Sequence, residues 1–90
     1  MKEIIFTFNP KEEHFSYVKF ASGIVHRASE FMSDMLLSSN GQNKVVNVDL
    51  KSILGVMSLH QGVGQEFKIT IEGKDEDLAY MSLDSYIKNI

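Results

Sequence analysis

The stretch DLKSILGVMSL, from Asp49 to Leu59, carries most of the information about the fold. Ser52 is a good helix N-cap, because its side-chain oxygen can accept a hydrogen bond from a free backbone N–H of the first turn. The residues that follow predict a short helix from Ile53 to Leu59. Gly62 and Gly64 then end this helix and lead into the next element.

Alternation of hydrophobic and polar residues predicts strands before and after this helix. Residues 2–8 and 66–72 alternate in this way, and their inward-facing residues are Ile4, Phe6, Phe8, Phe67, Ile69 and Ile71. Between the extended runs 35–39 and 45–48, the pair Asn40-Gly41 predicts a β-hairpin, since both residues tolerate a positive φ. Because residues 42–44 follow this pair, we expect a loop of more than two residues.

Two further segments have the spacing of amphipathic helices. In residues 15–31 the apolar series are Tyr17, Ala21, Ile24, Ala28 and Phe31, with Val18 and Val25 beside them. Gly23 costs this helix about 1 kcal/mol relative to alanine, which indicates close packing against a neighbour. Residues 75–77 are acidic, as the dipole favours at the start of a helix. The apolar stripe of that last helix is Leu78, Ala79, Leu83, Tyr86, Ile87 and Ile90.

The predicted element order is β-α-β-β-α-β-α. This order indicates the α+β class, an open-faced β-sandwich in which three helices cover one face of a four-stranded antiparallel sheet. The chain has 90 residues, one proline and no repeat or linker, so we expect one domain over residues 1–90.

Composition excludes several classes of function. Without cysteine the chain has no disulfide framework and no thiolate metal site, and its three histidines have no paired spacing. The formal charge of −3 argues against nucleic-acid binding. No signal peptide or membrane-spanning run is visible, so we expect a cytoplasmic protein that does not bind membranes.

The stretch from Asp49 to Leu59 resembles the HPr family, the small phosphocarriers of the bacterial sugar phosphotransferase system. That family carries the similar sequence Leu-Lys-Ser-Ile-Met-Gly-Val-Met-Ser-Leu on its short second helix. The resemblance extends over essentially the whole chain, because Ala28–Phe31, Asn40-Gly41, Gly64 and Ile69–Ile71 also fall in step with it. It implies an HPr-like fold and a carrier or regulatory role without catalytic activity or a cofactor of its own.

The chain departs from the family at the phosphorylated histidine. The signature Gly-x-His-Ala-Arg-Pro-Ala falls on Phe15–Ala21 when the two sequences are aligned without a gap. Tyr17 then stands at the position of the histidine, Lys19 at that of the arginine and Phe20 at that of the proline. A phenol titrates near pH 10 and gives a much less reactive phosphoester than imidazole. We therefore expect no phosphohistidine relay at this position.

The three histidines offer one alternative. His14 lies three residues before Tyr17, and a different register of the helix start would make it the carrier. His26 is expected to be exposed, opposite the apolar stripe of its helix, and His60 follows the second helix. An active phosphocarrier that uses His14 therefore remains open, as does a degenerate domain that acts only through protein contacts.

The resemblance makes Ser52 the main candidate site. In Gram-positive relatives the matching serine is phosphorylated by HPr kinase, and the product is a corepressor in catabolite control. A catabolite-repression paralogue in the family lacks the histidine and keeps this serine. The alternative is that Ser52 only caps its helix, which is worth about 1 kcal/mol. We predict regulatory phosphorylation at Ser52.

A partner surface is expected around this serine. Ile53, Leu54 and Met57 are predicted to form an exposed apolar patch, with Val56 and Leu59 facing the core. The resemblance implies that such a patch binds HPr kinase, a transcriptional regulator or other proteins of the phosphotransferase system. Lys51 and Lys19 would add positive charge. The oligomeric state stays open.

Overall fold

The computed structural model describes residues 1–10, 16–41, 44–60 and 64–90. Its elements follow the predicted order, βαββαβα. They are β1 (Lys2–Thr7), α1 (Tyr17–Ala28), β2 (Asp34–Gly41), β3 (Lys44–Asp49), α2 (Ile53–Ser58), β4 (Glu66–Glu72) and α3 (Glu76–Lys88).

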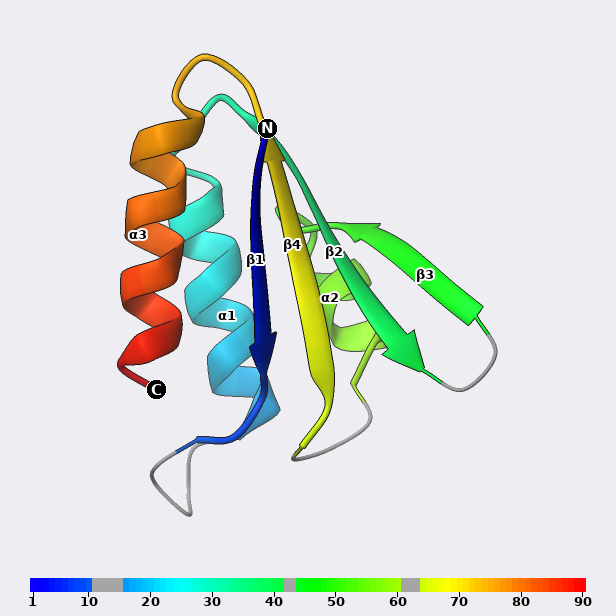
Figure 1. Cartoon of the computed structure of the whole chain (residues 1–90). Helices are drawn as coiled ribbons and strands as arrows, with labels where there is room; N and C mark the ends of the chain where they lie inside the picture. Colours follow the sequence, from blue (N-terminus) through cyan, green and yellow to red (C-terminus); the bar gives the residue numbers. More distant parts are fainter. Residues whose placement is uncertain (11–15, 42–43, 61–63) are drawn as a thin grey trace.

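The four strands form one antiparallel sheet in the order β1-β4-β2-β3. Figure 1 shows the three helices on one side of this sheet, while its other side is left open. The predicted fold class, an open-faced α+β sandwich, is therefore confirmed. Within the described ranges, no helix has both the length and the apolar character needed to cross a bilayer.

The core lies between the sheet and the helices. All six inward-facing residues predicted for β1, its continuation and β4 are buried, since successive side chains of a strand point to opposite faces. In the central strand β4 the buried residues are Phe67, Ile69 and Ile71, and they alternate with exposed or half-buried polar residues. Strand alternation therefore places the hydrophobic residues of β4 under the helices.

The α1 helix is shorter than the predicted range of 15–31. Ser16 is its N-cap and accepts a hydrogen bond from the backbone N–H of Lys19. At the other end, the N–H of Glu30 and that of Phe31 donate to carbonyls three residues earlier, which is the pattern of a 3₁₀ turn. The α-helix consequently ends at Ala28.

Gly23 packs closely against another helix, as predicted. A Cβ atom at this position would overlap the phenol ring of Tyr86 from α3. The Tyr86 hydroxyl lies there because it donates a hydrogen bond of 3.1 Å to the carbonyl of Phe20. Gly23 thus makes room for the α1–α3 contact.

Two residues of the predicted apolar stripes are exposed. Val18 and Leu78 have 55% and 64% of their surface accessible. Each is next in sequence to a fully or largely buried residue, Tyr17 and Ala79 respectively, and one residue turns an α-helix by about 100°. The remaining residues of the predicted stripe of the last helix are buried or packed against the core.

The hairpin between β2 and β3 differs from its prediction. Asn40-Gly41 belongs to β2 itself, and Gly41 pairs with Lys44 of β3. This register leaves only residues 42–43, which lie outside the described residues, between the paired ends. The prediction of a longer loop was wrong, because the extended run continues through the Asn-Gly pair.

Candidate functional site

Ser52 lies at the N-cap of α2, as predicted. Its backbone is extended, with φ −104° and ψ 113°, and its Oγ accepts a hydrogen bond of 3.2 Å from the N–H of Gly55. The Ser52 carbonyl accepts the first helical bond, from the N–H of Val56. The side chain is half-buried. Its hydroxyl oxygen therefore lies beside the N–H groups of the first helical turn.

The hydrophobic residues of α2 divide between the surface and the core. Val56 and Leu59 are buried, as predicted. Leu54 has 81% of its surface accessible and Ile53 41%. Met57 is half-buried and packs against the core. The exposed apolar surface beside Ser52 consequently consists mainly of Leu54 and Ile53, with Met57 at its base.

The two lysines predicted near this surface differ in their surroundings. The ammonium of Lys51 donates a hydrogen bond of 2.8 Å to the carbonyl of Phe31, and its backbone N–H donates to Asp49. Lys19 is exposed on the first turn of α1. The side chain of Lys51 thus binds the backbone of the segment after α1, whereas the side chain of Lys19 is accessible.

Tyr17, which the sequence comparison predicts to stand in place of the family's histidine, is part of the core. Only 4% of its surface is accessible. Its hydroxyl donates a hydrogen bond of 2.7 Å to the carbonyl of Val56, which links the start of α1 to α2. Its ring packs edge-on against Phe8 and is stacked near Phe67. A side chain held in this way is not displayed to a partner protein.

Burial also makes the Tyr17 phenol a poor nucleophile. Removal from water disfavours the phenolate and raises the pKa of Tyr17 to about 12. The ring of His60 lies flat on the Tyr17 ring, with 4.4 Å between the centroids and 15° between the planes. The neutral phenol is therefore covered by an imidazole on one side.

The histidines do not form a cluster in the part of the chain that the structure describes. His26 is exposed in the last turn of α1, as predicted, and His60 is exposed just after α2. His14 lies outside the described residues. Within the part of the chain that is described, no three His, Asp or Glu side chains are grouped so that they could hold a metal ion.

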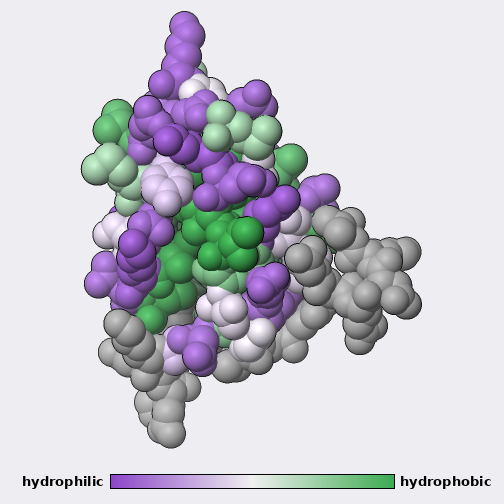
Figure 2. All heavy atoms as spheres, viewed as in Figure 1, coloured by the Kyte–Doolittle hydropathy of each residue, from purple (hydrophilic) through white to green (hydrophobic). Residues whose placement is uncertain are grey.

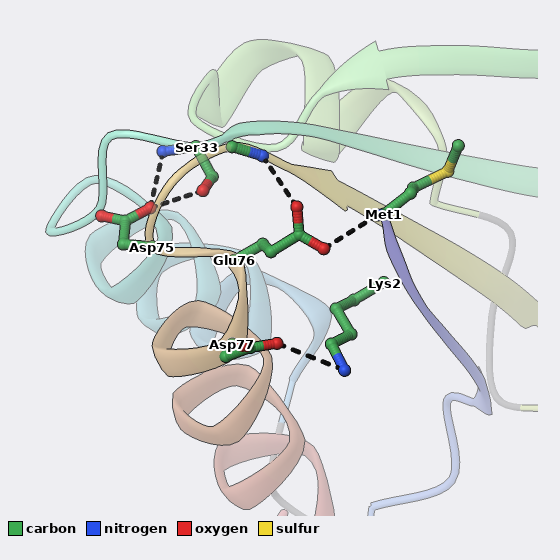
Figure 3. A network of polar contacts seen from close by, with 7 residues as sticks. Met1, Lys2, Ser33, Asp75, Glu76 and Asp77 are labelled. Atoms are coloured by element: carbon green, nitrogen blue, oxygen red, sulfur yellow. Dashed lines mark hydrogen bonds and ion pairs between the residues drawn. The ribbon is translucent and has the colours of Figure 1, made fainter.

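The acidic residues 75–77 form a clamp around the start of α3 (Figure 3). The Asp75 carboxylate accepts hydrogen bonds from the backbone N–H of Met32, at 2.8 Å, and from both the N–H and the hydroxyl of Ser33. The hydrogen bond from the Ser33 hydroxyl, followed by that from Met32, lowers the pKa of Asp75. The sequence analysis placed this residue at the start of a helix and did not predict these contacts.

The carboxylates of Glu76 and Asp77 form ion pairs with the first two residues of the chain. Glu76 forms an ion pair of 2.8 Å with the α-ammonium of Met1 and accepts a hydrogen bond from Gly73 (Figure 3). Asp77 lies 3.2 Å from the ammonium of Lys2. The hydrogen bond that Glu76 accepts from the α-ammonium lowers the pKa of this carboxyl group. These contacts serve the fold and lie on elements other than α2.

Comparison with known proteins relates this geometry to one family. A family model described as "PTS HPr component phosphorylation site" matches residues 14–89. Among solved structures, HPr-C-His from Thermoanaerobacter tengcongensis is similar, with 31% identity and a TM-score of 0.79 over 98% of this chain and 92% of that one.

Two Bacillus structures are similar as well. The phosphocarrier protein HPr from Bacillus anthracis strain Ames has 29% identity and a TM-score of 0.73, over 96% of this chain and 95% of that one. Crh, the catabolite repression containing protein of Bacillus subtilis, has 29% identity and a TM-score of 0.65, over 92% and 84% of the two chains. That protein forms an intertwined dimer with a swapped domain.

Proposed function

Because the chain belongs to the HPr family, we propose that it is a regulatory or binding module of the phosphotransferase system, controlled by phosphorylation of Ser52 rather than by a phosphohistidine. The observation that carries this proposal is the burial of Tyr17 and its hydrogen bond to the Val56 carbonyl. A relay needs a reactive and accessible group, and this side chain is neither.

The surroundings of Ser52 support its role as the modified residue. In the proposed reaction the Ser52 Oγ attacks the γ-phosphorus of ATP on a kinase, its proton passes to a base of that kinase, and ADP leaves. The product oxygens would replace Oγ as acceptor for the N–H of Gly55, which the geometry already directs toward the side chain. The positive end of a helix favours the added negative charge.

The neighbouring apolar surface supports binding of a protein partner. Leu54 and Ile53 are exposed directly after Ser52, so a phosphate on this serine would lie beside hydrophobic side chains. An interface of this kind combines burial of apolar area with a charged anchor that the unmodified protein lacks. The exposed Lys19 is proposed to add positive charge at the edge of this surface. The reaction requires ATP, so the proposed function belongs in the cytoplasm.

The test uses HPr kinase with ATP, followed by binding to the transcriptional regulator of catabolite control. We expect a phosphoryl mass gain in wild type and in Ser58→Ala, whose serine is exposed in the same helix, and none in Ser52→Ala. Kinase-treated wild type should bind the regulator more tightly than treated Ser52→Ala does. Equal binding by these two proteins would overturn the regulatory role.

A second candidate is an active phosphocarrier that uses His14. This possibility is supported by the description of the matching family model as a phosphorylation site, because His14 lies within the matched residues 14–89. Enzyme I with phosphoenolpyruvate would then phosphorylate wild type and His26→Ala but not His14→Ala. If neither enzyme I nor the kinase adds phosphate, the domain acts through protein contacts alone.

A further inference from the structure

The side of the sheet opposite the helices is accessible and has a distinct composition. Alternation places every second residue of each strand on this open face, and the cross-strand register aligns them in rows. One row contains Ile5, Lys68, Ser38 and Asn47, and the next contains Glu3, Thr70, Leu36 and Asp49.

The open face has a hollow with two exposed aliphatic side chains among polar ones. Ile5 and Leu36 expose 68% and 46% of their surface on either side of β4. Both line a hollow of about 490 Å³, together with Ser38, Asn47, Glu66, Lys68 and Thr70. Ser38 is 4% accessible and therefore lies at the floor of this hollow. In Figure 2 a hydrophobic area on this side of the molecule is flanked by hydrophilic side chains.

The rim of the open face is negatively charged. Among the described strand residues, the register places five carboxylates on this face and one lysine, Lys68. The five are Glu3, Asp34, Asp49, Glu66 and Glu72. Lys68 forms an ion pair of 3.3 Å with Glu3. Among the described residues, none of the other four carboxylates has a cation within ion-pair distance.

The placement of two of these carboxylates costs stability. Asp34 and Glu72 are directly opposite each other in the pairing of β2 with β4. Like charges at such positions destabilise a sheet. They line a second hollow of about 420 Å³, which shares Leu36 with the first and is also lined by Lys51. A local conflict of this kind is typical of a functional surface.

We infer that the open face of the sheet binds a partner protein through a segment that presents an aliphatic side chain between lysines or arginines. The aliphatic side chain would enter the hollow between Ile5 and Leu36, and the cations would meet the unpaired carboxylates of the rim. Aliphatic contacts combined with a charged, solvent-accessible rim are typical of a transient protein interface. The negative rim repels nucleic acid.

This inference does not depend on the proposed function, because α2 and Ser52 lie on the helical side of the sheet. The probe is the capped peptide Gly-Lys-Arg-Leu-Lys-Arg-Gly, added to the isotope-labelled full chain and followed by NMR. A matched peptide carries serine in place of leucine. We expect shifts of amide signals in β1, β4 and β2, and binding of the serine peptide weaker by about tenfold, as for loss of one buried aliphatic side chain.

Variants of the chain separate the contribution of the charged rim to binding from that of the aliphatic side chain. The double variant Asp34→Asn/Glu72→Gln should weaken binding about fivefold while leaving the fold intact, since it removes a repulsion. Its control is Glu30→Gln/Asp84→Asn, which changes the net charge equally on the helical side and should leave affinity unchanged. Ile5→Thr keeps a β-branched residue in the strand. It should lower the affinity for the leucine peptide and leave the affinity for the serine peptide unchanged.

Three results would overturn the inference. The first is equal affinity for the leucine and serine peptides, which would indicate charge attraction alone. The second is mapping of the shifts to α1 and α2. The third is concentration-dependent self-association of the chain through β1 and β4, because a second copy would then cover the open face.

Discussion

The hydroxyl of Tyr17 donates a 2.7 Å hydrogen bond to the carbonyl of Val56, and so a residue in the first turn of α1 is connected to the helix that Ser52 caps. Val56 is fully buried, and its carbonyl also accepts the N–H of Leu59 at the end of α2. Tyr17 thus links α1 to α2 from within the core.

Removal of this hydroxyl should cost little stability at neutral pH. In Tyr17→Phe the ring contacts remain and the Val56 carbonyl keeps its bond from Leu59, so we expect a loss of about 1 kcal/mol in the free energy of unfolding. Urea denaturation measures this loss. A variant as stable as wild type would show that the hydrogen bond contributes nothing.

The raised pKa of Tyr17 predicts a loss of folding stability at alkaline pH. Because the folded pKa of Tyr17 is raised from 10.0 to about 12, its contribution is fully present below pH 10 and is lost as the pH rises toward 12. Wild type should therefore lose more stability than Tyr17→Phe over this interval. Parallel stability curves would contradict the raised pKa.

Leu54 should contribute to binding and not to folding. Because 81% of its surface is accessible, Leu54→Ser should leave the urea midpoint unchanged. The same substitution should lower kcat/KM of HPr kinase toward this protein about fivefold, as expected for a contact residue at an interface. Leu78→Ser, at a similarly exposed leucine on α3, is the matched control and should behave as wild type. Equal effects of both substitutions would argue against a specific surface at α2.

The Asp75 clamp predicts sensitivity to acid. Hydrogen bonds from Ser33 and Met32 hold the pKa of Asp75 below its ordinary value of 3.8, so its contribution is present above that value and is lost as the pH falls through the lower folded pKa. Asp75→Asn should be less stable than wild type at neutral pH, and the difference should shrink in acid. Thermal unfolding at several pH values measures it, and a pH-independent difference would contradict the account.

Gly23 provides a test of the helix contact. Alanine is normally the better helix former by about 1 kcal/mol, but here its Cβ would meet the Tyr86 ring. Gly23→Ala should destabilise wild type by about 1–3 kcal/mol, as overpacking does. In a Tyr86→Leu background the same substitution should be neutral or stabilising. The double-mutant cycle fails to support the contact if the two effects simply add.

The fold could be predicted from local patterns because each strand and helix carries its own periodicity. Strand alternation gave the correct buried residues in β1 and β4, and Ser52 marked the start of α2. Element ends were less predictable. The end of α1 depends on a 3₁₀ turn, and the hairpin register depends on how far the strands pair.

The site was only partly accessible to such reasoning. Helical spacing placed Tyr17 on the buried face of α1, so the signal for its burial was present. Its partner was not predictable, because Tyr17 and Val56 are 39 positions apart in sequence. Ser33 and Asp75 are likewise 42 positions apart. Contacts between distant segments arise from tertiary packing, which no local pattern specifies.

The most direct test of the proposed function compares two phosphoryl donors by intact-mass analysis. One sample of the wild-type chain is incubated with HPr kinase and ATP, and another with enzyme I and phosphoenolpyruvate. We predict a gain of one phosphoryl group with the kinase, absent in Ser52→Ala, and no gain with enzyme I. A gain with enzyme I would contradict the account, because a histidine would then still carry phosphate.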